Sequence, residues 1–341
     1  MDSAETNSGG RLDVQGELRK LTQKRLERFV TLVPKFLVNG DPDVIHDLRV
    51  ASRRLQQILR ASASPDKNKN GRKVFRILRR ARRAIGPCRN LDVNAALAQS
   101  RVGEAQSELL RNGWEALHRH LQDNRHALLA DARRRVAKYD LASFIARAEA
   151  LFDAAGLEAD PTPRLRTAVQ KSMTEWDEAC ARAEERRSVE HLHALRIATK
   201  RLRYCAEILV DIGAGAFEVT AKDLQQLQSA LGDWHDRCVF VQFVAEFIGR
   251  PQYLLHHPDM AGALLTHVEQ EQKRNTEAVE DILSRAPELR QRWKDGQGPG
   301  KRRSGKSAVQ KPPRATTRPP VPADSSKTSS TDPDRSTISK P

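Results

Sequence analysis

The most telling stretch of this chain reads HDLRVASRRL at residues 46–55 and returns as HALRIATKRL at residues 193–202. Both follow the pattern His-x-x-Arg-x-x-x-(Arg/Lys)-Arg-Leu, and the two copies lie 147 residues apart. At about 100° per residue, an α-helix brings the histidine and two cations of each copy onto one face and the leucines onto the opposite face. We expect the apolar faces to pack into a helical bundle and the cationic faces to form a positive groove with no carboxylate in it.

The residues around this pattern repeat as well. The matches at an offset of 147 or 146 are Leu18 with Leu165, Phe29 with Trp176, Ile85-Gly86 with Leu231-Gly232, and Val93 with Val239. Asp41 and Ser188 are matching helix N-cap candidates. Since a single gap suffices from residue 18 to residue 93, the sequence predicts two tandem copies of one helical unit.

Composition favours an all-α fold. Charged residues make up 30% of the 341 positions and aromatic residues only 5%, and good helix formers dominate. Helical periodicity and turn signals, among them Gly86-Pro87, predict about six helices per half. The expected helices are 14–36, 42–62, 72–85, 90–101, 104–137 and 140–154, then 162–187, 189–211, 217–231, 236–249, 258–284 and a short piece to 294.

The chain divides into three parts. Residues 1–10 are expected to be disordered, and residues 11–294 to form the helical domain, with repeat 1 at about 11–156 and repeat 2 at about 160–294. Residues 295–341 are rich in Pro, Ser, Lys and Arg and are expected to be a disordered basic tail. The four cysteines form no metal-binding spacing, and neither a secretory signal nor a membrane-spanning stretch is visible, so a cytoplasmic protein is expected.

The excess of basic residues indicates a polyanionic partner. The net charge is +15, and the tail from Lys301, with ten Lys/Arg and three Asp, contributes +7 of it. Residues 67–89 hold ten Lys/Arg and no acid, in a helical stripe whose like charges repel one another. We expect an anion to neutralise this stripe. The second half has Lys222 at the position that matches Arg76, but neutral residues at the positions that match the other arginines of the stripe. The first half should therefore attract anions more strongly.

These motifs resemble the CHAD domain family, whose name refers to its histidine-containing α-helical repeats. The resemblance covers about residues 11–290 and rests on the paired His-x-x-Arg stretches and on the Ile/Leu-Gly turns that precede Asn90 and Asp236. It implies two pseudo-symmetric helical bundles whose basic faces line a central cleft for inorganic polyphosphate, and an association with polyphosphate granules. The chain departs from the family pattern at Gln56, where a further basic residue is usual, and at Asn90, which replaces an Asp.

The expected function is therefore non-catalytic binding of polyphosphate, without a cofactor or a metal. The oligomeric state stays open. We expect both histidines of the motif to be hard to protonate in the empty site, and binding to tighten below about pH 6.5. The predicted binding residues are His46, Arg49, Arg53, Arg54, Arg76, Arg79, Arg80, Arg83, His193, Arg196, Lys200, Arg201, Arg203 and Lys222, with Lys24 and Lys171 as further candidates.

Other functions remain open at this point. Non-specific nucleic-acid binding through the basic surface and the tail is the main alternative, although no helix-turn-helix, zinc finger or aromatic RNA module is evident. A phosphotransfer histidine is a second alternative. Asp43-x-x-His46 and Glu190-x-x-His193 have a spacing found in di-iron bundles, but Arg49 and Arg196 on the same faces would repel a divalent cation.

Overall fold

The computed structural model describes residues 13–62, 68–155, 161–213 and 218–296, which belong to one compact unit. Every regular element in these ranges is a helix, which confirms the all-α fold. The predicted disordered ends, residues 1–10 and 295–341, lie outside the described residues except for 295–296, which belong to the last helix. The helices are α1 (Val14–Val38), α2 (Pro42–Ser62), α3 (Lys69–Glu104), α4 (Glu108–Val136), α5 (Leu141–Ala155), α6 (Thr162–Arg186), α7 (Val189–Asp211), α8 (Glu218–Ile248), α9 (Pro251–His256) and α10 (Pro258–Gly296).

Three of the predicted helix breaks were wrong. α3 continues through Gly86-Pro87, α8 continues past Gly232, and α10 continues through Pro287. Proline removes one backbone hydrogen bond and costs about 3 kcal/mol inside a helix. In α3, buried side chains lie both before and after Pro87, so tertiary packing of one continuous helix outweighs that cost. The short α9 was not predicted.

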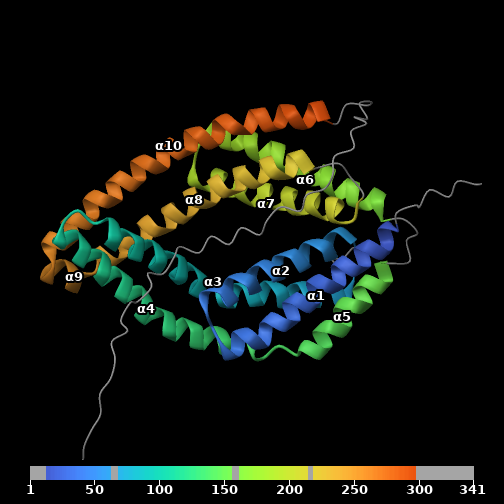
Figure 1. Cartoon of the computed structure of the whole chain (residues 1–341), viewed down its shortest axis with the longest axis horizontal. Helices are drawn as coiled ribbons and strands as arrows, with labels where there is room; N and C mark the ends of the chain where they lie inside the picture. The colour runs from blue at the N-terminus through green and yellow to red at the C-terminus, as the bar shows by residue number, and fades with distance from the viewer. Residues whose placement is uncertain (1–12, 63–67, 156–160, 214–217, 297–341) are drawn as a thin grey trace, which may run out of the picture. The chain divides into compact units, whose positions relative to one another are not determined.

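The helices of the two halves pack in corresponding ways. α2 packs between α1 and α3, and α3 lies along α4; likewise α7 packs between α6 and α8, and α8 lies along α10 (Figure 1). The halves meet where α2 contacts α7 and α3 contacts α8, and α4 contacts α10 further along. The correspondence agrees with an internal repeat, although a shared origin of the halves stays a prediction.

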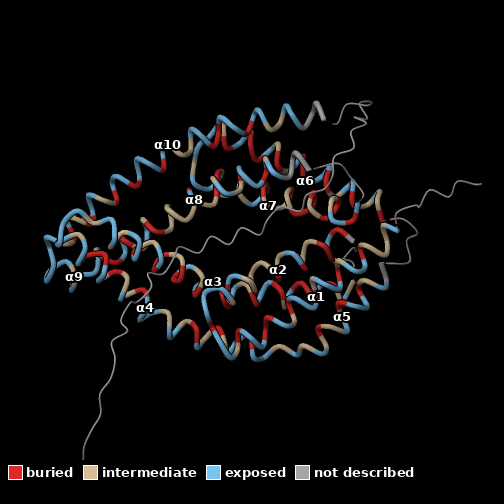
Figure 2. The backbone as a smooth tube through the Cα atoms, in the orientation of Figure 1, coloured by how far each residue is buried: buried red, intermediate tan, exposed pale blue. Residues whose placement is uncertain are grey.

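The two halves share their main hydrophobic core. One cluster of buried side chains takes residues from α1 to α3 and from α6 to α8, among them Leu48 of the first motif and Leu195 of the second. Buried positions accordingly lie on the sides of the helices that face one another (Figure 2). A second cluster around Trp114 joins the far ends of α3, α4, α8 and α10. The helical bundles of the two halves therefore share one main core.

One pair of matching core positions differs between the two halves. Phe29 of the first half is fully buried and needs no polar partner. The matching Trp176 is also buried, and its indole Nε1 donates a hydrogen bond of 3.0 Å to Thr199 Oγ1. Thr199 stands at the position of Ser52 in the first motif. The larger, polar ring thus comes with a hydroxyl that accepts its hydrogen bond.

A buried carboxylate joins the halves at the end of the molecule away from the motif helices. Glu271 of α10 is 1% exposed. It accepts hydrogen bonds from Arg101 of α3 at 2.8 Å and from Arg274 at 2.7 Å. A buried charge is tolerated when it is paired in this way.

Candidate anion-binding site

A cavity of about 310 Å³ lies where α2 and α3 face α7 and α8. Both halves contribute to its wall, and most of the side chains that line it are polar. Its basic lining residues are His46, Arg49, Arg53, Arg89, Arg196, Lys200 and His235. A recess of this size is within the range of ligand-binding pockets.

Five of the predicted binding residues line this cavity. Arg49 and Arg53 follow His46 at helical spacing on α2, and Arg196 and Lys200 take the matching positions on α7. The buried leucines of both helices hold these faces in place, since Leu48 and Leu195 have no exposed surface. The structure therefore brings the cations of the two motifs together, as the sequence predicted.

The other predicted residues do not line the cavity. His193 is nearest, with its ring centroid 5.1 Å from that of His235. Arg201 pairs with Glu175, and Arg203 lies 3.0 Å from Glu207. The remaining residues are exposed on their helices: Lys24, Arg54, Arg76, Arg79, Arg80, Arg83, Lys171 and Lys222.

The predicted arginine stripe on α3 lies outside the cavity because it is displaced along the helix axis. The cavity is lined by the part of α3 from Arg89 to Asn94. Arg83 precedes Arg89 by six residues, or about 9 Å of helix, and Arg76 lies further still. Arg80 does not line the cavity either, and its charge acts on Tyr139, which follows α4 in the chain, against the larger effect of burial on the pKa of that tyrosine. A binding role for these residues stays a prediction.

Sequence reasoning missed Arg89 and His235, and the wrong helix breaks explain why. The expected turns placed both residues between helices, where their direction could not be assigned. In the continuous α3 and α8 they point into the cavity beside the Arg49 and Arg196 faces. A signal was present, because the two residues match at the offset of 146 that also relates Asn90 to Asp236.

Gly86 allows α2 and α3 to approach closely at the edge of the cavity. A Cβ atom at this position would lie 3.1 Å from Arg49 Nη1. The same Nη1 donates to the backbone carbonyl of Arg82 at 3.4 Å. Glycine thus leaves room for the guanidinium that the motif places here.

The expectation of a groove without carboxylates was wrong. Asp233 and Asp236 of α8 line the cavity, and Asp236 lies 4.0 Å from Arg196. Burial raises the pKa of Asp236, while the cations Arg196 and Lys200 act in the opposite direction. Five Lys/Arg side chains still face two carboxylates, so the cavity keeps a positive balance.

The cations in the cavity are crowded and partly removed from water. Burial, with Arg53, Arg89 and Arg196 nearby, lowers the pKa of Arg49 to about 10. Burial and the charges of Arg196 and Arg53 lower the pKa of Lys200 to about 7. Such shifts mean that the empty site disfavours its own positive charge, and a bound anion would relieve this.

Burial and neighbouring cations also lower the pKa values of the histidines at the site. Burial and the charge of Arg89 lower the pKa of His46, and burial and Arg196 lower that of His193. This direction agrees with the expectation from the sequence. The effect is larger at His235, where burial and Arg196 lower the pKa to about 4.

Several polar atoms of the cavity residues lack a hydrogen-bond partner in the part of the chain that the structure describes. Among the described residues, no hydrogen bond reaches the buried Nε of Arg196, Oδ1 of Asn94 or Oε1 of Gln228. A buried donor or acceptor costs free energy unless a ligand or water satisfies it. The Arg196 donor is therefore free to bind an acceptor oxygen.

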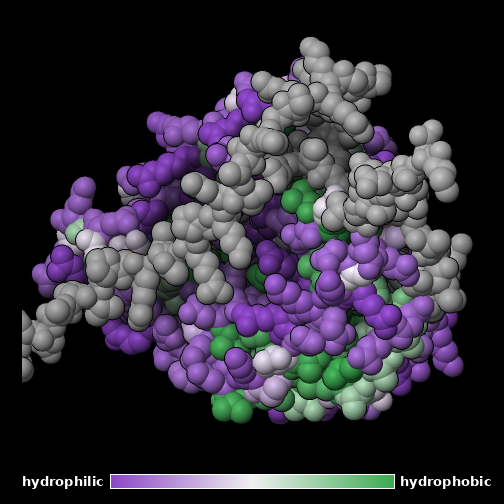
Figure 3. Space-filling model, turned by 45° about the vertical axis from the view of Figure 1, so that its right-hand side comes forward, coloured by the Kyte–Doolittle hydropathy of each residue, from purple (hydrophilic) through white to green (hydrophobic). Residues whose placement is uncertain are grey.

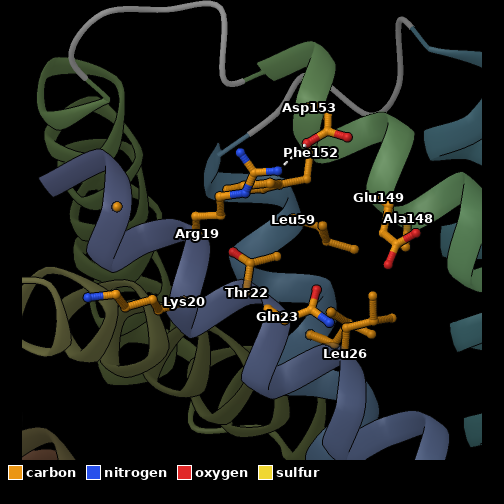
Figure 4. Close-up of a pocket in the computed structure, with 12 residues that line it drawn as sticks. Arg19, Lys20, Thr22, Gln23, Leu26, Leu59, Ala148, Glu149, Phe152 and Asp153 are labelled. Carbon is orange, nitrogen blue, oxygen red and sulfur yellow. Dashed lines mark hydrogen bonds and ion pairs between the residues drawn. The ribbon is translucent and has the colours of Figure 1, made fainter.

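A second hollow, of about 490 Å³, lies between α1, α2 and α5 and has a different character (Figure 4). Apolar side chains such as Leu26, Leu59 and Phe152 form much of its wall. Its arginine, Arg19, pairs with Asp153 at 3.2 Å. It does not gather unpaired cations, so we do not assign it to anion binding.

One face of the molecule is mostly hydrophilic. Hydrophilic side chains cover most of the face in Figure 3, with smaller hydrophobic patches among them. Within the described ranges, no cluster of His, Cys, Asp and Glu could hold a metal ion. Nor does any helix in those ranges have the length and apolar character to cross a membrane.

Comparison with known proteins identifies the family. The CHAD domain model matches residues 20–245, well over half of the sequence, and the chain therefore belongs to the CHAD domain family. A search of the curated proteins found no match.

Two solved structures share the fold. The crystal structure of the CHAD domain from the plant Ricinus communis is 20% identical, with a TM-score of 0.57 over 80% of this chain and 91% of that chain. PptA from Streptomyces chartreusis is 14% identical, with a TM-score of 0.52 over 79% of this chain and 99% of that chain.

Proposed function

We propose that this protein binds inorganic polyphosphate in the cavity between α2, α3, α7 and α8, without transforming it. One observation carries the proposal: five Lys/Arg side chains from both halves converge on one recess, where burial and neighbouring cations lower the pKa values of Arg49 and Lys200. Membership of the CHAD family, which is linked to polyphosphate, supports the same ligand. The proposal includes an association with polyphosphate granules in the cytoplasm.

The chemistry of the lining suits a chain of phosphates. Each arginine offers a planar fork of donors that can bind two phosphate oxygens, and Lys200 adds a mobile point charge. Polyphosphate has no bases, so it needs no aromatic stacking platform, and the cavity contains only histidine rings. Release of counterions would drive binding, which should weaken steeply with salt.

The concave shape favours a flexible chain over duplex nucleic acid. A duplex carries its phosphates on a convex cylinder, whereas a single polyphosphate chain can enter a recess between helices. Binding to DNA through the general basic surface would not depend on Arg49 and Arg196. The two ligands can therefore be separated with variants of these residues.

The decisive variant is Arg49→Glu/Arg196→Glu in the full-length protein. We expect its affinity for long-chain polyphosphate to fall at least about 100-fold at roughly 150 mM salt, because two charge-assisted contacts become repulsive. Affinity for duplex DNA should be weaker than for polyphosphate in the unaltered protein. Titration calorimetry gives both values, and circular dichroism checks that helicity is unchanged.

Lys24→Glu/Lys171→Glu is the matched control. It makes the same change of charge, with one residue from each half at corresponding positions. Both residues were binding candidates from the sequence, but they are exposed and neither lines the cavity. We expect less than about a threefold effect from screened surface charges. Equal losses in the two double variants, or stronger binding of DNA than of polyphosphate, would refute the cavity as a polyphosphate site.

The non-catalytic part of the proposal has its own test. We expect polyphosphate incubated with the protein and Mg²⁺ to keep its chain length and to release no orthophosphate beyond the blank. Labelled phosphate should not become attached to His46 or His193. Release or covalent labelling that is lost in His46→Gln or His193→Gln would instead indicate an enzyme.

A further inference from the structure

The basic side chains of α2 and α3 continue beyond the cavity. Arg82 lies next to Arg53, donates to the backbone carbonyl of Ser52 at 3.3 Å, and also hydrogen bonds to Gln56. Arg79 lies one turn away on α3 and Arg60 one turn further along α2, and both lower the pKa of Arg82. We call Arg60, Arg79 and Arg82 the α2–α3 arm.

No carboxylate of the described residues pairs with the α2–α3 arm. The charges that act on Arg82 are all positive, and together with burial they lower its pKa to about 10. Arg60 and Arg79 are exposed, so they can reach a ligand. The guanidinium of Arg60 lies over the ring of Phe75, 5.6 Å from its centroid, which restrains its position.

The second half lacks an equivalent arm. At the positions that match Arg60, Arg79 and Arg82 it has Glu207, Gln225 and Gln228. The one arginine gained there, Arg203, is neutralised by Glu207 at 3.0 Å. Three arginines that have no carboxylate partner among the described residues thus correspond to no net charge at the matching positions of the second half.

The length of the α2–α3 arm suits a chain ligand. Arg53 at the cavity and Arg60 are seven residues apart on α2, which is about 10 Å of helix. A ligand that leaves the cavity along α2 and α3 therefore meets further arginines at once. A ligand that leaves along α7 and α8 meets glutamines at the two matching positions of α8 and a single exposed cation, Lys222, beyond them.

We infer that the α2–α3 arm is a second phosphate subsite, which holds the part of a polyphosphate chain that extends out of the cavity and so makes binding one-sided and length-dependent. The inference rests on the proposed function. It predicts that short chains are bound by the cavity alone. Longer chains gain affinity only through the first half.

The test compares tripolyphosphate with long-chain polyphosphate on full-length Arg60→Gln/Arg79→Gln. We expect roughly tenfold weaker binding of the long chain, because two charged contacts are lost, and less than a twofold change for tripolyphosphate. The dependence of log affinity on log salt should fall by about 1.4 for the long chain, or about 0.7 per lost contact, as for single-stranded polyanions. Arg82 is left in place because it also binds the backbone.

Two further variants sharpen the result. Arg111→Gln/Lys138→Gln removes two exposed charges from the same half, one on α4 and one just after it, and should leave both affinities unchanged within twofold. Glu207→Gln/Gln225→Arg frees Arg203 and adds a cation on the second half. It should strengthen long-chain binding several-fold and leave tripolyphosphate unaffected.

The outcomes separate the two proposals. If Arg49→Glu/Arg196→Glu abolishes binding but Arg60→Gln/Arg79→Gln leaves the preference for long chains intact, the cavity stands and the α2–α3 arm is wrong. Equal weakening for both ligands also overturns the arm, because it would then act as part of the cavity. If the unaltered protein binds neither ligand, both proposals fail.

Discussion

At the scale of single residues, the charge of Lys200 near neutral pH is expected to depend on whether an anion occupies the cavity. This lysine lies among Arg196 of its own helix, Arg49 and Arg53 of α2, and Asp236 of α8. Burial and the arginines outweigh the carboxylate and bring its pKa from 10.5 to about 7. Its charge near neutral pH therefore depends on whether an anion is bound.

We predict that polyphosphate binding takes up a proton at Lys200. A bound polyanion raises the pKa of this lysine, so affinity should rise as the pH falls from about 9 towards 7 and level off, for this group, below the empty-site value. The histidines, whose pKa values are lowered in the empty site, should add a further gain below about pH 6.5. Calorimetry in buffers of different ionisation enthalpy measures this proton uptake.

Lys200→Arg is the matched control for the pH dependence. Arginine keeps the positive charge but does not titrate in this range, so affinity should lose its slope between pH 7 and 9 and keep it below about 6.5. An unchanged slope between pH 7 and 9 in this variant would assign the proton uptake to another group.

At the scale of elements, α3 determines what the cavity contains. Its continuation through Gly86-Pro87 carries Arg89 and Asn90 to the cavity on the same helix that holds the α2–α3 arm. Pro87 is exposed and lacks the N–H that would bond to the carbonyl of Arg83. The helix is thus maintained against its local sequence preference by packing on α2 and α4.

We predict that Pro87→Ala raises the free energy of unfolding by about 1–3 kcal/mol, because it restores a helical hydrogen bond and removes a steric conflict. Urea denaturation measures the change. Pro42→Ala serves as the control, since Pro42 is the first residue of α2, where an N–H has no helical partner, and no gain is expected. A loss of stability in Pro87→Ala would mean that α3 needs a proline-induced bend.

At the scale of the whole molecule, the two halves contact each other in two regions. The shared core joins α1 to α3 with α6 to α8, and Arg25 of α1 reaches Asp211 of α7 at 3.1 Å. Further away, Arg101 of α3 pairs with the buried Glu271 of α10. The cavity between the halves is therefore held by contacts on both sides of it.

We predict that Arg101→Leu lowers the free energy of unfolding by about 3 kcal/mol, because it leaves the buried Glu271 with fewer partners. Arg101→Leu/Glu271→Leu should recover most of this loss, since an apolar pair replaces the ion pair without an unpaired charge. Arg134→Leu, which removes an exposed pair with Asp131, should cost less than about 1 kcal/mol. Thermal and urea unfolding of the three variants test this ranking, and a similar loss in all three would contradict it.

The sequence by itself determined the class of fold, most helix positions and five residues of the cavity. These features follow from local periodicity: the spacing of His46, Arg49 and Arg53 sets one face of α2, and Leu48 and Leu55 lie on the buried face. The same argument holds for Arg196 and Lys200 on α7. Such patterns repeat within a few turns of one helix, so they can be recognised without knowledge of contacts between distant parts of the chain.

Only the tertiary structure decided which other side chains join them. Helical periodicity gives a direction around an axis, but it does not say how far along that axis another helix crosses. The crossing of α2 and α7 with α3 and α8 therefore placed Arg89, His235 and Asp236 in the cavity and left Arg76 and Arg83 outside. Packing energy that overrode the local preference of Gly86-Pro87 for a turn made this arrangement possible.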